Sequence, residues 1–102
     1  MIYHVTARLR NETAAAFLTK HTDGTIARQR PDGPEIVASM ERAVLNADGL
    51  VEWSETCFCQ SPLAQERATV LDQHFDEFKT EPIEGHVAYK GRPFMDHLKS
   101  LA

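Results

Sequence analysis

The segment Ile2–Leu9 limits the possible folds of this chain most strongly, because apolar and polar side chains alternate along it. Tyr3, Val5, Ala7 and Leu9 then point to one side of an extended strand and form one strongly apolar face. Such a strand needs other elements packed on that face. We therefore expect a sheet with a covering layer.

The composition is that of an ordinary globular domain. The chain has 102 residues, of which 42% are hydrophobic and 25% charged. This length suits one core, so we expect a single domain over residues 1–102. The net charge of −4 argues against nucleic acid as a partner, because such binding depends on an excess of Lys and Arg.

The longest apolar run also bears on location. Ala14–Leu18 is far shorter than the ~20 residues that a membrane span needs. Arg8, Arg10 and Glu12 lie where a secretory signal would need its apolar stretch. We therefore expect a cytoplasmic protein without a membrane partner.

Two helices and a final helical turn are predicted from apolar spacing and capping residues. Asn11 is the expected N-cap of the first helix, and Ser61-Pro62 opens a second helix that runs to about Lys79. A short last strand is expected over residues 86–89. The buried positions are predicted to be Ala14, Phe17 and Leu18 in the first helix, Leu71, Phe75 and Phe78 in the second, and Phe94, Leu98 and Leu101 in the final turn.

The segment Glu35–Leu45 fits two structures. Its apolar residues recur at helical spacing, and Pro34 suits a first helical position. We favour a strand, because Asn46–Gly49 has the form of a hairpin turn and Leu50–Cys59 follows as the clearest strand. Pairing of residue 46 with residue 50 would then place Glu41 opposite Glu55 and residue 43 opposite residue 53.

The expected order is strand, helix, strand, strand, helix, strand. This order predicts an α+β fold, a ferredoxin-like βαββαβ sandwich with one antiparallel sheet. In topology and size, the chain resembles the small proteins of the dimeric α+β barrel superfamily, in which two such sheets pack face to face. The resemblance implies a homodimer that forms a dimeric α/β barrel. It leaves the activity open, because the fold hosts monooxygenases, isomerase-like enzymes and proteins of no known activity.

The first strand also carries the main candidate site. His4 and Arg8 lie on its second face, which would meet the partner sheet in a barrel. There they would line a pocket for a small anionic or oxygenated molecule, with Arg8 as a carboxylate clamp and His4 as a proton carrier. Trp53 is expected as an aromatic wall, and Glu55 as a further binding residue. The alternative is that this face is solvated.

Cys57 and Cys59 form the other notable pattern. A zinc site would need about four ligands, and the chain has no second Cys pair. We favour core packing over a reactive thiol or a metal site. The leading functional hypothesis is a homodimer that binds or transforms a small organic molecule without a cofactor. The alternative is a non-catalytic interaction module whose sheet face is a self-association surface.

Overall fold

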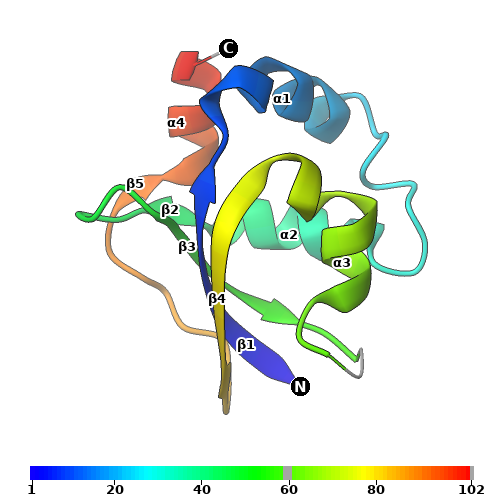
Figure 1. Cartoon of the computed structure of the whole chain (residues 1–102), viewed down its shortest axis with the longest axis vertical. Helices are drawn as coiled ribbons and strands as arrows, with labels where there is room; N and C mark the ends of the chain where they lie inside the picture. Colours follow the sequence, from blue (N-terminus) through cyan, green and yellow to red (C-terminus); the bar gives the residue numbers. More distant parts are fainter. Residues whose placement is uncertain (59–60, 102) are drawn as a thin grey trace.

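The computed structural model describes residues 1–58 and 61–101 and shows an α+β fold (Figure 1). One antiparallel sheet of five strands, in the order β4-β1-β3-β2-β5, is present in these residues. The strands are β1 Ile2–Leu9, β2 Val44–Leu45, β3 Val51–Thr56, β4 Phe75–Ile83 and β5 Arg92–Pro93. The helices are α1 Ala14–Thr22, α2 Gly33–Arg42, α3 Ala64–Thr69 and α4 Phe94–Leu101, with short 3-10 turns η1 Asn11–Thr13 and η2 Leu71–Gln73.

Strand β1 is an interior strand of the sheet, between β4 and β3. It pairs with β3 on one side and with β4 on the other. Its odd-numbered side chains are buried in the core, and its even-numbered ones are partly or fully exposed. The prediction for residues 2–9 is therefore confirmed.

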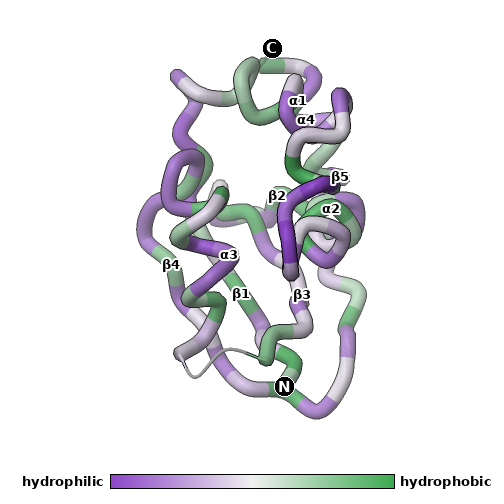
Figure 2. Tube along the Cα trace, turned by 90° about the vertical axis from the view of Figure 1, so that its right-hand side faces the viewer, coloured by the Kyte–Doolittle hydropathy of each residue, from purple (hydrophilic) through white to green (hydrophobic). Residues whose placement is uncertain are grey.

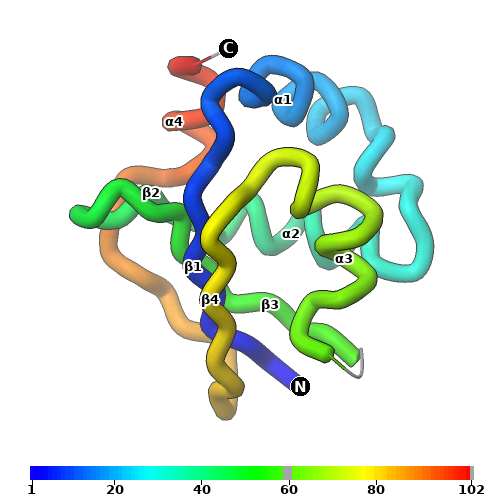
Figure 3. Tube along the Cα trace, viewed as in Figure 1, coloured from blue at the N-terminus to red at the C-terminus, as the bar shows by residue number. Residues whose placement is uncertain are grey.

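Helices α2 and α3 lie on one side of the sheet and the 84–91 segment lies on the other (Figures 1 and 3). Helix α2 packs against β3, whereas the 84–91 segment runs from the end of β4 to β5 across the other side. Helices α1 and α4 contact each other at the end of the molecule farthest from the N-terminus (Figure 2). Within the described residues, no helix has the length and apolar character needed to cross a bilayer.

The favoured strand over residues 35–45 is wrong for most of its length, because residues 33–42 form helix α2. Pro34 lies at the helix start, and Ile36 and Met40 are buried on one side of the helix. At Ala43 the backbone becomes extended, which leaves only Val44–Leu45 to pair with β3.

The hairpin register is nevertheless confirmed. Val44 lies opposite Glu52, and the amide of Asn46 donates to the carbonyl of Leu50 at 2.9 Å. Gly49 takes the left-handed conformation expected of this turn, with φ +78°. The expected pair of Glu41 and Glu55 does not form, because Glu41 belongs to α2.

The predicted helix from residue 62 to 79 is also corrected. It is confirmed only over α3, and β4 begins at Phe75. A β-bulge explains the error: β4 shifts its pairing with β1 near Glu77, which has φ +57°. The extra residue lets Phe75 and Phe78 both turn toward the core, at a spacing of three that is typical of a helix.

Three smaller predictions have different outcomes. The expected strand over residues 86–89 is absent from the structure, which shows no regular element there. The final helix is confirmed as α4, with Phe94 and Leu98 buried, but Leu101, which was also expected in the core, is exposed. Asn11 makes no capping bond, and the first helix begins instead with the 3-10 turn η1.

Candidate functional site

The best-defined polar cluster lies on the sheet face turned away from α2, called the outer face here. Its side chains come from His4 and Thr6 of β1 and from Glu52, Ser54 and Thr56 of β3, because cross-strand partners in this register share a face. The even-numbered residues that the alternation placed opposite the apolar face therefore gather here.

His4 and Glu52 form a close pair on the outer face. The Nε2 atom of His4 lies 2.6 Å from Oε2 of Glu52, and the two side chains are 28% and 17% exposed. The other Glu52 oxygen accepts a hydrogen bond from the Asn46 side-chain amide at 3.2 Å. A carboxylate held in this way fixes the orientation of the imidazole ring.

The 84–91 segment covers part of this cluster. The ring of Tyr89 stacks on the ring of His4, with centroids 4.7 Å apart and planes 18° apart. Further along, the ring nitrogens of His86 lie 2.7 Å from the Ser54 hydroxyl and 3.1 Å from the Thr56 hydroxyl. Burial, together with the nearby Glu52 and Glu81 charges, raises the pKa of Tyr89. Its phenol therefore stays neutral at physiological pH.

A cleft of about 230 Å³ opens beside His4. It is lined by His4, Thr6, Lys79, Thr80 and Glu81 from the neighbouring strands β1 and β4. When Glu52 accepts the Nε2 proton, the Nδ1 atom of His4 keeps a lone pair that can take a proton. Lys79 supplies a positive charge next to it. The cleft thus combines a proton acceptor, a cation and a hydroxyl group.

The structure separates the four residues that the sequence grouped into one site. His4 and Arg8 lie along the same strand, but Arg8 is exposed and forms an ion pair with Glu77 of β4. Trp53 and Glu55 lie on the opposite face and are fully buried in the core. The expected aromatic wall of Trp53 is therefore replaced by Tyr89, and the expected cation Arg8 by Lys79.

Glu55 is a buried carboxyl group in the core. The indole N–H of Trp53 donates to its Oε1 at 2.8 Å, and within the described residues its Oε2 has no hydrogen-bond partner. The nearby Ser39 hydroxyl donates to Glu35 at 3.4 Å. Burial, and secondarily the charges of Glu66 and Glu35, raise the pKa of Glu55 to about 8. At pH 7 this group is mostly protonated.

Cys57 packs in the core, as we expected from the sequence. Its side chain is buried, and its Sγ lies 3.4 Å from Oε2 of Glu66. Cys59 lies outside the described residues. Among residues 1–58 and 61–101, no three His, Cys, Asp or Glu side chains are grouped as a metal ion would require.

Sequence reasoning did not identify Glu52 and Tyr89, the two side chains that contact the His4 ring. Glu52 is opposite Thr6 in the β1–β3 pairing, so it could have been found once that pairing was known. Tyr89 is on an irregular segment, and no periodic pattern places it on His4.

We compared the chain with known protein families, curated proteins and solved structures. No protein-family model, curated protein or solved structure matches the chain.

Proposed function

We propose that the protein binds a short hydroxy or oxo acid on its outer face and exchanges a proton with it through His4. The observation that carries this proposal is the partly buried His4–Glu52 pair beside a polar cleft. A histidine oriented by a carboxylate is a common proton carrier in proteins.

The cleft chemistry supports an acid as the ligand. Lys79 can pair with a carboxylate, and Thr6 can donate to a carbonyl or hydroxyl oxygen. Glu81 can accept a hydrogen bond from a hydroxyl group. The volume of about 230 Å³ limits the ligand to a few heavy atoms, because it is smaller than a drug-sized site.

The test is a titration with lactate and pyruvate, followed by amide NMR spectra. At least one acid should shift the amides of residues 4–6 and 79–81 in a saturable way. His4→Gln should weaken that binding about tenfold, because one charge-assisted hydrogen bond contributes about 1.4 kcal/mol or more. His97→Gln on α4 is the matched control and should bind like the parent protein.

The proposal is wrong if no acid shifts these amides at roughly 50 mM, a concentration far above the dissociation constant of a specific site. Equal binding by the His4 and His97 variants would also overturn the role of His4. A change of proton uptake on binding, measured by calorimetry in two buffers, separates proton exchange from simple binding.

Self-association is the alternative function. Val87 on the 84–91 segment is 51% exposed, and it lines a second cleft of about 290 Å³ with Arg42, His86 and Ala88. We propose that a second copy packs on this segment. The β4-β1-β3-β2 order is compatible with a ferredoxin-like topology, whose resemblance implied a homodimer.

The mass in solution tests this alternative. A dimer near twice 11.5 kDa by light scattering, returned to a monomer by Val87→Asp, would support it. A monomer at every concentration would exclude it and leave the outer face free for the acid.

A further inference from the structure

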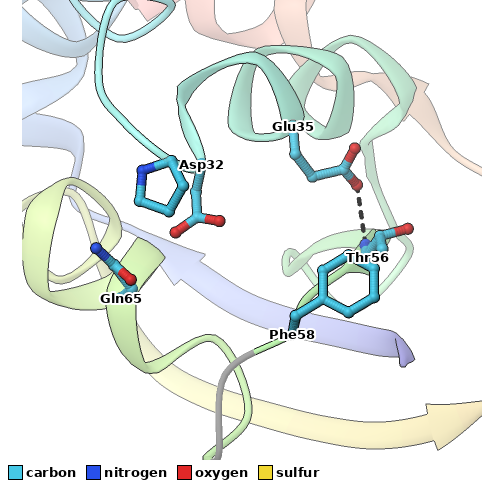
Figure 4. Close-up of a pocket in the computed structure, with 6 residues that line it drawn as sticks. Asp32, Glu35, Thr56, Phe58 and Gln65 are labelled. Atoms are coloured by element: carbon cyan, nitrogen blue, oxygen red, sulfur yellow. Dashed lines mark hydrogen bonds between the residues drawn. The ribbon is translucent and has the colours of Figure 1, made fainter.

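A third pocket shares no lining residue with the His4 cleft or with the Val87 cleft. It has a volume of about 440 Å³, within the range of small-molecule sites. Its walls come from the start of α2, the end of β3 and the α3 helix (Figure 4). The lining residues are Pro31, Asp32, Glu35, Thr56, Phe58 and Gln65.

Asp32 is the unusual residue of this pocket. Its Oδ2 atom is buried and, within the described part of the chain, has no hydrogen-bond partner. Asp32 occupies the N-cap position of α2 but makes no side-chain capping bond. Figure 4 shows its carboxylate extending into the space between Gln65 and Phe58. Removing a carboxylate oxygen from water without a partner is unfavourable, so a cation bound beside the Asp32 carboxylate would stabilise its charge.

Glu35 differs from Asp32 because its charge is already compensated. Its Oε2 atom accepts from the Thr56 amide at 2.8 Å and from the Arg42 guanidinium at 3.1 Å. These bonds fix Glu35 as a rigid wall of the pocket. The uncompensated negative charge is therefore that of Asp32.

Phe58 supplies an apolar wall. Its side chain is 91% exposed, which is unusual for a large hydrophobic residue, and Figure 4 shows its ring at the pocket beside Thr56. An aromatic face attracts a cation and also packs against an aliphatic chain. The Gln65 side chain adds a carbonyl acceptor on the α3 side.

We propose that this pocket binds a small organic cation, an alkylammonium group on a short apolar stem. The ammonium group would donate to the Asp32 carboxylate and to the Gln65 carbonyl, and the stem would lie against Phe58. An ammonium suits the pocket because it offers three donors, whereas the carboxylates present only acceptors.

The test is a titration with n-butylammonium chloride, followed by amide NMR spectra at constant ionic strength. We expect saturable shifts of the amides of residues 32–35, 56 and 65. n-Butanol has the same stem without the charge and should bind at least tenfold more weakly. Equal shifts with n-butanol would overturn the proposal, as would no shift with n-butylammonium.

The contact of the ammonium group with Asp32 and the contact of the stem with Phe58 are each tested by a variant. Asp32→Asn keeps the shape of the side chain and should weaken n-butylammonium binding about tenfold, because a charge-assisted bond is lost. Asp48→Asn removes a carboxylate from the exposed 46–49 turn and is the matched control. Unchanged binding by the Asp32 variant, relative to the Asp48 variant, would contradict the assignment.

Phe58→Ala is a second variant, which tests the proposal even if Asp32→Asn disturbs the start of α2. The exposed Phe58 contributes little to the core, so this variant should fold normally and bind two- to fivefold more weakly. Parent-like affinity would exclude the stem contact.

A comparison of two probes identifies the source of the cation. Nα-acetyl-lysine N-methylamide presents the same ammonium group on a blocked residue, as a lysine in a peptide would. Binding of n-butylammonium alone would assign the pocket to a free amine. Binding of both with similar affinity would assign it to a lysine side chain, and binding of neither would overturn the proposal.

Discussion

Two buried titratable residues, Glu55 and His74, respond to pH in opposite directions. The pKa of Glu55 is raised to about 8, chiefly by burial. The pKa of His74 is lowered to about 4, also chiefly by burial and further by the charges of Lys20 and Arg10. Each residue therefore prefers its neutral form in the folded protein, which makes stability depend on pH on both sides of neutrality.

Glu55→Gln should remove the loss of stability at alkaline pH. The folded protein keeps a proton that the unfolded chain releases above pH 4.5, so the Glu55 contribution falls as pH rises from 4.5 to 8. We expect the variant to gain on the order of 3 kcal/mol relative to the parent between pH 5 and pH 8. Urea unfolding at both pH values measures this, with exposed Glu84→Gln as the control. A difference that does not change with pH would contradict the prediction.

His74→Gln should reduce the loss of stability in acid. The neutral ring accepts from Lys20 Nζ at 3.3 Å, contacts the Thr13 hydroxyl at 2.9 Å and stacks on Phe17. Because its folded pKa is lowered, the His74 contribution is complete above pH 6.5 and is lost as pH falls toward 4. The variant should be less stable at pH 7 but show a shallower decline in acid. Thermal unfolding from pH 7 to 4 tests the slope, and an unchanged slope would exclude His74 as its origin.

At the level of elements, local patterns predicted β1 and α4 because each buries its apolar side chains at one regular spacing. The pattern failed at Phe75 and Phe78, where a bulge gives a strand the spacing of a helix. It also failed at Glu35–Leu45, where Ile36 and Met40 suit both structures. In both places the choice between helix and strand depends on tertiary contacts, which cannot be predicted from a short segment.

Gly33 shows how closely the start of α2 packs on the preceding loop. A Cβ atom at this position would lie 2.2 Å from the Ile26 carbonyl oxygen and 2.9 Å from that of Ala27. Gly33→Ala should therefore lower the free energy of unfolding by about 2–3 kcal/mol, since backbone atoms cannot yield easily. Gly85→Ala is the control, because nothing lies near its added carbon. Chemical denaturation measures both, and equal stability would refute the close approach.

At the level of the whole molecule, an aromatic cluster joins distant elements into one core. Phe94 of α4 packs near Phe17 of α1 and Phe75 of β4, with centroids 6.3 and 5.9 Å apart. Phe75 in turn packs against Trp53 of β3 at 5.5 Å. Unfolding of one of these elements would expose the aromatic rings of the others, so the core should unfold cooperatively.

Phe94→Ala should destabilise the whole molecule by about 3–4 kcal/mol. Because the rings are in contact, Trp53 fluorescence and far-UV circular dichroism should report the same lowered midpoint. Leu101→Ala, at a position 38% exposed, should cost less than about 1 kcal/mol. An early change in circular dichroism alone would show that α4 unfolds independently of the core.

The candidate site was predictable only in part. The residues that were missed reach the site through tertiary contacts, which the sequence pattern does not show. His4 is on the face that alternation alone assigns, so sequence reasoning could find it. Its partners Glu52 and Tyr89 reach it from β3 and from the 84–91 segment. Arg8 shares the strand with His4, but its charge is taken by Glu77 across the bulge.

Strand β4 forms one edge of the sheet, and its side chains determine what that edge can join. An unprotected edge invites further strands and thereby aggregation. Here the bulge at Glu77 interrupts the regular row of backbone donors and acceptors, and Pro82 removes another donor. Exposed charges on Asp76, Lys79 and Glu81 oppose close approach by a neighbouring strand. The irregularity that misled the helix prediction thus also protects the protein from edge-to-edge polymerisation.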